Sequence, residues 1–162
     1  MRSPGEVAAA ADLVHENATE NLALKQSVYE EVEAKAPPTL VIASSTGGIP
    51  PTQLQAKMRH PGRLVVCHPF NPPHLVPFVE VSGAPFTQPE VVARTLAFMT
   101  AVGQSPIEIR HEIHGFVLNR LQWTLMAEAY RLVRDGVASA DDVDRAIRDG
   151  LGVQLSQLQI TI

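Results

Sequence analysis

Cysteine, aromatic residues and long apolar runs are all scarce in this sequence. A single cysteine, Cys67, occurs in 162 residues, which excludes an internal disulfide framework. No apolar run approaches the roughly 20 residues that span a bilayer, and the first residues lack the basic start and apolar stretch of a signal peptide. We therefore expect a soluble, cytoplasmic protein without a membrane partner.

An excess of basic residues is missing as well. Lysine and arginine number 13 against 17 acidic residues, and the net charge is -4. A nucleic-acid-binding domain usually carries a basic face, so we expect no nucleic-acid partner. Apolar residues make up 45% of the chain. This is enough to bury the core of one ordinary domain, or of one domain with a short appendage.

Strand-like and helix-like segments alternate up to residue 110. Continuous apolar, β-branched runs predict buried strands, and apolar residues at helical spacing predict the helices between them. The predicted strands span 39–43, 63–67, 78–81 and 106–110, and the predicted helices span 20–33, 50–58 and 88–102. Residues 9–14 fit either a strand or a helix end, and Asn17 or Thr19 would cap the helix that follows. The alternation predicts an α/β fold with a mostly parallel sheet.

The remainder of the chain has only helical patterns. Apolar residues recur at helical spacing over 116–133, and Gly136 ends this long helix. A second helix is predicted over 140–148. The last residues, 153–162, are predicted to form a strand-like or frayed tail.

Two residues near one strand end indicate acid–base chemistry. His68 directly follows the predicted strand 63–67, and ligands of open α/β sheets bind just outside the carboxyl ends of strands. Histidine can act as a general base near neutral pH. Glu80 lies inside the apolar strand 78–81, where an unpaired carboxylate is costly, so we predict that it pairs with His68 and orients the ring. The alternative is a solvent-facing Glu80 on an edge strand and a structural His68.

No metal site is predicted. His60, His68, His74 and Cys67 are close in the sequence, but their spacing matches no ordinary zinc pattern. Cys67 is expected to be a small buried apolar residue rather than a nucleophile.

Three segments together resemble the 3-hydroxyacyl-CoA dehydrogenase family. They are His68-Pro-Phe-Asn-Pro-Pro, Leu75-Val-Pro-Phe-Val-Glu-Val and Gly115-Phe-Val-Leu-Asn-Arg-Leu-Gln. The resemblance covers about residues 9–152 and is to the branch with L-gulonate 3-dehydrogenase (lambda-crystallin) and 3-hydroxybutyryl-CoA dehydrogenase. It implies the C-terminal half of a Rossmann-type NAD-binding domain in residues 1–112. Residues 113–162 would begin an all-helical C-terminal domain for substrate binding and dimerisation.

The resemblance also implies roles for individual residues. His68 would be the catalytic base that removes the proton of the 3-hydroxyl group, and Glu80 would orient it. Asn119 would hydrogen-bond the substrate. Glu20 and Lys25 would approach the nicotinamide half of NAD, although their spacing alone fits a solvated helix face.

The loop after the strand 39–43 contains a match and a departure. Ser45 matches a polar position of the family that lies close to the cofactor and the substrate. Where the family usually places a hydroxyl that helps to bind the substrate oxygen, this chain has Gly47. A second departure is that the 162 residues contain no G-x-G-x-x-G fingerprint for the pyrophosphate of NAD.

The family resemblance leads to one expected function and one alternative. We expect NAD-dependent oxidation of the 3-hydroxyl of a 3-hydroxyacyl-CoA or a related 3-hydroxy acid, a small-molecule substrate. Complete family members are expected to be homodimers. The alternative is a catalytically inactive, truncated fragment or a structural, crystallin-like relative that lacks the ADP-binding half.

Overall fold

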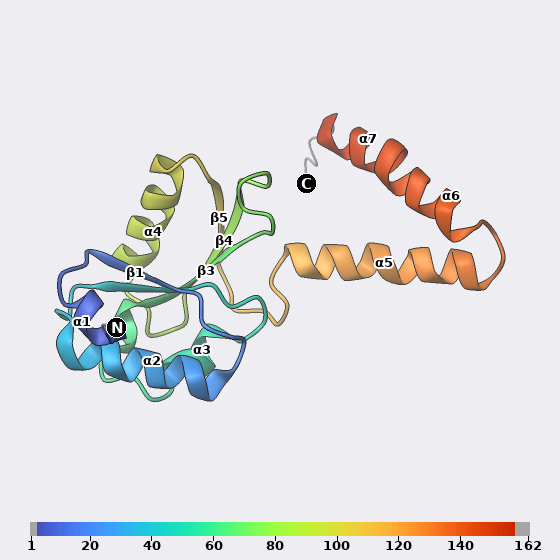
Figure 1. Ribbon diagram of the computed structural model, residues 1–162. Helices are drawn as coiled ribbons and strands as arrows, with labels where there is room; N and C mark the ends of the chain where they lie inside the picture. Colours follow the sequence, from blue (N-terminus) through green and yellow to red (C-terminus); the bar gives the residue numbers. More distant parts are fainter. Residues whose placement is uncertain (1–2, 158–162) are drawn as a thin grey trace. The chain divides into compact units, whose positions relative to one another are not determined.

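A five-stranded sheet forms the centre of the first part of the chain (Figure 1). The computed structural model describes residues 3–157. The strands lie in sequence order: β1 (Leu13–Glu16), β2 (Val41–Ser44), β3 (Leu64–Pro69), β4 (Phe78–Ser82) and β5 (Ser105–Ile109). Neighbouring strands are parallel except β3 and β4, which are antiparallel. The predicted α/β fold with a mostly parallel sheet is therefore confirmed.

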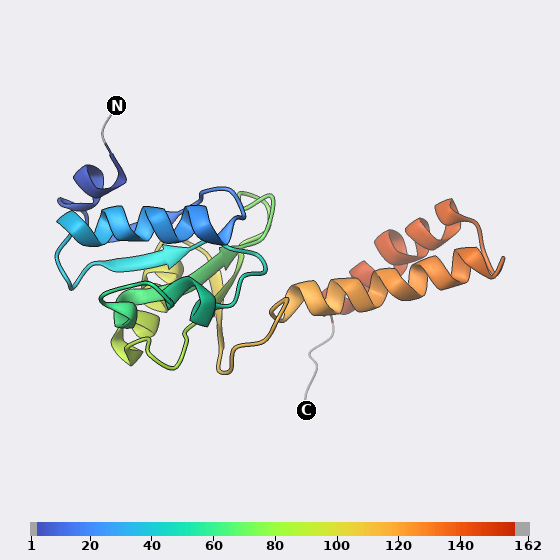
Figure 2. The same ribbon diagram turned by 90° about the horizontal axis from the view of Figure 1, so that it is seen from below.

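Helices cover both faces of this sheet. The short α1 and the longer α2 lie on one side with α3, and α4 lies on the other (Figures 1 and 2). Their bounds are α1 (Pro4–Ala8), α2 (Leu22–Lys35), α3 (Pro51–Gln55) and α4 (Pro89–Ala101), and a 3-10 turn, η1 (Pro61–Arg63), precedes β3. The strand β3 serves both layers, because successive side chains alternate between the faces. Leu64 and Val66 join the core under α2, whereas Val65 and Cys67 join the core under α4.

The start of α2 differs from the prediction. Asn21 caps the helix, and its side chain accepts a hydrogen bond of 3.0 Å from the Leu24 N–H. The expectation that Asn17 or Thr19 caps this helix is therefore wrong. The side chain of Asn17 instead donates to the carbonyl of His15 at 3.0 Å. The residues between β1 and Asn21 form a loop, so the helix begins only after it.

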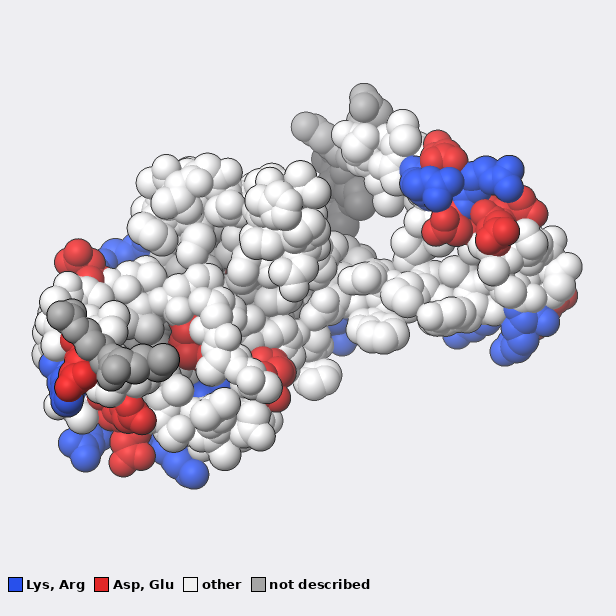
Figure 3. Space-filling model, viewed as in Figure 1, with Lys and Arg blue, Asp and Glu red and all other residues white. Residues whose placement is uncertain are grey.

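Residues 118–157 form a second, helical unit. It consists of α5 (Leu118–Arg134), α6 (Ala140–Arg145), a π-helical segment η2 (Ala146–Leu151) and α7 (Gly152–Gln157). Ion pairs within α6 and η2 account for the charged side chains gathered over this segment in Figure 3. The predicted strand-like or frayed tail is wrong for residues 153–157, because the helix continues through them. Residues 158–162 lie outside the described part.

Within residues 3–157, no helix is both long enough and apolar enough to cross a bilayer.

The buried position of Cys67 generates a prediction about its reactivity. Its side chain is inaccessible, and burial raises the pKa of the thiol to about 12. Because the thiolate is the reactive form, native protein at pH 8 should react with a disulfide reagent such as DTNB at least about a hundredfold more slowly than denatured protein. A native thiol that reacts as fast as the denatured one would contradict the burial.

Candidate active site

His68 and Glu80 face each other across the antiparallel pair of β3 and β4. The register places the two residues directly opposite, a position in which side chains on the same face contact each other. His68 Nδ1 lies 3.1 Å from Glu80 Oε2. The Glu80 side chain is fully buried, and the His68 side chain is 13% exposed. The structure thus brings together the two residues proposed as base and orienting carboxylate, and Glu80 does not face solvent.

The second carboxylate oxygen of Glu80 is also bonded. Its Oε1 accepts the backbone N–H of Val117 at 2.8 Å. The donors from His68 and Val117 offset the cost of burying this carboxylate. Because a carboxylate only accepts, the neutral imidazole carries its proton on Nδ1, and the lone pair lies on Nε2.

Two aromatic rings pack against the His68 ring, and a glycine lies on its third side. The rings of Phe70 and Phe116 lie with their centroids 5.2 Å and 5.8 Å from its own. On the Nε2 side lies Gly47, where an added Cβ would come within 3.2 Å of Nε2. The missing side chain at this position therefore leaves space directly beside the basic nitrogen.

An open cleft of about 610 Å³ lies beside His68. Its walls come from the last residues of β3 and from the loops that follow β1, β2 and β3, at the carboxyl ends of these strands, where α/β proteins bind ligands. The lining residues are Asn17, Glu20, Ser45, Gly47, Gly48, His68, Pro69 and Asn71. Of the residues predicted to approach the cofactor, Glu20 and Ser45 line the cleft. Asn17 and Asn71 were not predicted, although each follows a strand end as Ser45 does.

Glu20 lies in the turn before α2, and its side chain is 48% exposed. Its Oε1 accepts hydrogen bonds from the Thr46 hydroxyl and from the Gly48 N–H, the latter at 3.2 Å. The carboxylate therefore ties the β1–α2 turn to the loop that faces His68.

Lys25 lies beneath the cleft and does not line it. Its side chain is 1% exposed, so a solvated helix face is the wrong interpretation for this residue. Its Nζ donates to Glu16 Oε1 at 2.9 Å and Oε2 at 3.1 Å, and to the Ala18 carbonyl at 2.9 Å. Glu20 Oε2 lies 3.7 Å from the same Nζ.

The carboxylate of Glu16 forms a buried network that sequence reasoning missed. Glu16 Oε2 accepts from the Tyr29 hydroxyl at 2.7 Å and from the Ser44 hydroxyl at 2.9 Å. Burial alone would raise the pKa of Glu16, but the hydrogen bonds from Tyr29, Lys25 and Ser44 outweigh it and hold the pKa below the usual value. Glu16 ends β1, so the rule that a buried carboxylate needs a partner could have indicated that Glu16 has one, but not that the partner is Lys25.

The remaining candidate, Asn119, is the second residue of α5 and belongs to the second unit. Its contact with a substrate stays a prediction.

Comparison with protein families gives two matches that together cover nearly the whole chain. The NAD-binding domain of 3-hydroxyacyl-CoA dehydrogenase matches residues 2–113, and the C-terminal domain of the same family matches residues 115–161.

Individual relatives agree with these matches. An L-carnitine dehydrogenase from Oceanobacillus iheyensis is 43% identical over 148 residues, which are 91% of this chain and 48% of the relative. A lambda-crystallin homolog from Bos taurus is 43% identical over 141 residues, or 87% of this chain and 44% of the relative. The chain thus spans about half the length of the curated relatives that it matches.

A solved structure has the same fold. The crystal structure of 5-formyl-3-hydroxy-2-methylpyridine 4-carboxylic acid 5-dehydrogenase, described as an NAD+-dependent dismutase, has a TM-score of 0.89 and 36% sequence identity. The match covers 93% of this chain and 49% of that one. The matched domains belong to the family that the sequence motifs resemble. The match to the NAD-binding domain alone covers more than half of this chain. The chain belongs to the 3-hydroxyacyl-CoA dehydrogenase family.

Proposed function

We propose that this chain supplies the catalytic base and the nicotinamide side of an NAD-dependent dehydrogenase. The substrate is a 3-hydroxyacyl-CoA or a related 3-hydroxy acid, and the reaction oxidises its 3-hydroxyl group. The observation that carries the proposal is the His68–Glu80 pair, whose imidazole borders a cleft at the carboxyl ends of the strands. Membership of the family supports the NAD-dependent dehydrogenase chemistry.

The proposed reaction begins with the proton of the substrate hydroxyl. His68 takes this proton at Nε2, because Nδ1 is bonded to Glu80. As the O–H bond breaks, its electron pair forms the carbonyl, and the hydrogen on the same carbon leaves as hydride. Glu80 keeps the ring in place, and its charge offsets the positive charge that the ring gains. The substrate becomes a 3-oxo compound, and His68 then releases its proton to solvent.

The cleft residues fit the nicotinamide end of NAD. Gly47 and Gly48 leave the wall beside His68 and Glu20 without side chains, and a Cβ on Gly48 would lie 4.0 Å from Glu20 Oε1. In the proposal, the Glu20 carboxylate and the Ser45 hydroxyl hold this end of the cofactor through its hydroxyl and amide groups. NAD, when bound, accepts the hydride that the substrate loses.

Asn119, near the start of α5, is proposed to hydrogen-bond the substrate. L-carnitine, named for one relative, is itself a 3-hydroxy acid, so a substrate panel should contain it beside 3-hydroxybutyryl-CoA. The homodimer expected of complete family members stays a prediction.

A non-catalytic role is the second candidate. Gly47 provides no hydroxyl beside His68, the 162 residues contain no pyrophosphate-binding fingerprint, and a lambda-crystallin homolog is among the relatives. These observations favour an inactive or structural chain, which would bind no NAD.

Titration with NAD+ separates the two candidates. We expect NAD+ to bind to the 162-residue chain with a dissociation constant of about 1 mM or weaker, because only the nicotinamide side contributes contacts. Amide signals of Ser45 and Gly48 should move in two-dimensional NMR spectra, whereas those of α4 on the opposite face of the sheet should not. Absence of any movement at these two amides would contradict the proposed cofactor site.

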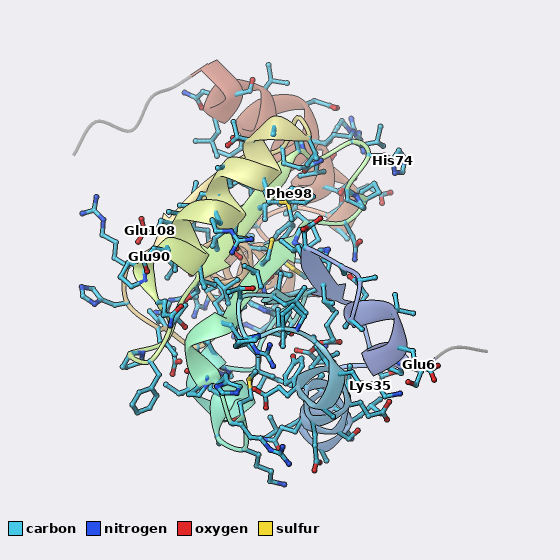
Figure 4. The ribbon with its side chains drawn as sticks, turned by 90° about the vertical axis from the view of Figure 1, so that its left-hand side faces the viewer. Glu6, Lys35, His74, Glu90, Phe98 and Glu108 are labelled. Carbon is cyan, nitrogen blue, oxygen red and sulfur yellow. The ribbon has the colours of Figure 1, made fainter. Side chains whose placement is uncertain are left out.

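Removal of the base tests the chemistry. In any form of the protein that turns over, His68→Ala should lower kcat at least about a hundredfold, because general base catalysis is lost. The measurement is NADH formation, with circular dichroism to establish that the variant is folded. His74→Ala is the matched control, since His74 is an exposed histidine in the neighbouring loop (Figure 4). An unchanged kcat in His68→Ala would overturn the assignment.

A further inference from the structure

The ammonium of Lys25 is buried directly behind a carboxylate that lines the cleft. Its side chain is 1% exposed, whereas that of Glu20 is 48% exposed. The Nζ hydrogens point to the carboxylate of Glu16 and to the carbonyl of Ala18, at distances of 2.9–3.1 Å. Glu20 Oε2, at 3.7 Å, lies within the range of an ion pair. A ligand in the cleft therefore reaches Glu20 and does not reach Lys25.

The buried charge of Lys25 is fixed by residues from three elements that meet at the cleft. Glu16 ends β1, Tyr29 comes from the same helix as Lys25, and Ser44 ends β2. Tyr29 and Ser44 both donate to the Glu16 carboxylate, and their hydroxyl oxygens lie 2.9 Å apart. A buried ion pair with this many hydrogen bonds has a defined geometry, so the Lys25 ammonium is held at one place.

Glu20 connects Lys25 to the loop between β2 and α3, which faces His68. One carboxylate oxygen faces Lys25, and the other accepts from the Thr46 hydroxyl and the Gly48 N–H. Thr46 is fully buried, and its hydroxyl also accepts the N–H of Ile49 at 2.9 Å. The Glu20 carboxylate thus links the loop between β2 and α3 to the buried ammonium of Lys25.

We infer that Lys25 is a positioning residue, which holds the Glu20 carboxylate and the adjoining loop in place for the nicotinamide nucleoside without contacting it. The inference rests on the proposed function for the identity of the ligand. The Lys25 charge is matched by Glu16 beneath the cleft, so no ammonium is offered there to a phosphate. The group presented is a carboxylate, which accepts hydrogen bonds from hydroxyls and suits the ribose diol beside the nicotinamide ring.

A double-mutant cycle tests whether Lys25 acts through Glu20. The variants are Glu20→Gln, Lys25→Met and their combination, each titrated with NAD+ on the full chain. We expect each single change to weaken NAD+ binding about threefold, because the hydrogen bond to the ligand is weakened rather than removed, and the shift of the Gly48 amide signal measures the titration. The combination should be no weaker than Glu20→Gln alone, because the two changes break one chain of contacts. Additive losses, about tenfold in the combination, would show that Lys25 acts independently of Glu20 and would overturn the inference.

A second readout needs no ligand. The amide signal of Gly48 reports its hydrogen bond to Glu20, so it should move in ligand-free Lys25→Met. An unmoved Gly48 signal would overturn the positioning role even if NAD+ binding falls. Conversely, if the unaltered chain binds no NAD+, the proposed function fails, and the Gly48 signal still decides the role of Lys25.

One further variant controls for folding, and a second controls for the loss of a lysine elsewhere on the same helix. Lys25→Met leaves Glu16 without its counter-ion, and a buried charge without a partner is strongly destabilising. The pair Glu16→Gln with Lys25→Met removes both charges and should fold, and it should still move the Gly48 signal. Lys35→Met is the matched control, because Lys35 ends the same helix and pairs with Glu6 at the surface at 3.5 Å (Figure 4). It should change neither NAD+ binding nor the Gly48 signal.

Discussion

The antiparallel pairing of β3 with β4 is the constraint on which the candidate site depends. Its register sets Glu80 directly opposite His68, and a slip of one residue would turn the carboxylate to the other face of the sheet. The backbone N–H of Val117 donates to the second carboxylate oxygen of Glu80 and so also holds this side chain in place. With the carboxylate fixed on one side of the imidazole, Nε2 is left on the side of Gly47 and the cleft.

Two buried carboxylates lie near the cleft, and their partners give them different tasks. Glu16 is matched by an ammonium and two hydroxyl donors, which keep it ionised and hold three elements together. Glu80 is matched by an imidazole and a backbone N–H. An imidazole can gain and lose a proton near neutral pH, whereas a buried ion pair with an ammonium serves as a fixed support. The chemistry of the partner therefore distinguishes the pair proposed to be reactive, Glu80 with His68, from the structural pair, Glu16 with Lys25.

Local sequence signals were sufficient for much of this arrangement. The apolar runs located the strands β2 to β5, and the isolated carboxylate in an apolar strand indicated that Glu80 needs a partner. The direction of β4 could not be predicted, because antiparallel and parallel strands look alike in a short apolar run. The burial of Lys25 could not be predicted from helical spacing either, since its partner Glu16 lies on another element, nine residues away. Tertiary contacts also decided the first residue of α2, which Asn21 caps after a loop that leaves β1.

The tautomer of the His68 ring is the most direct measure of the proposed base. Nitrogen-15 NMR of the chain, recorded at a pH where the ring is neutral, distinguishes a proton on Nδ1 from a proton on Nε2. The bond to Glu80 predicts a proton on Nδ1 and a free lone pair on Nε2. Glu80→Gln should weaken that preference, because an amide can donate as well as accept. A neutral ring that carries its proton on Nε2 in the unaltered chain would contradict the assignment of His68 as the base.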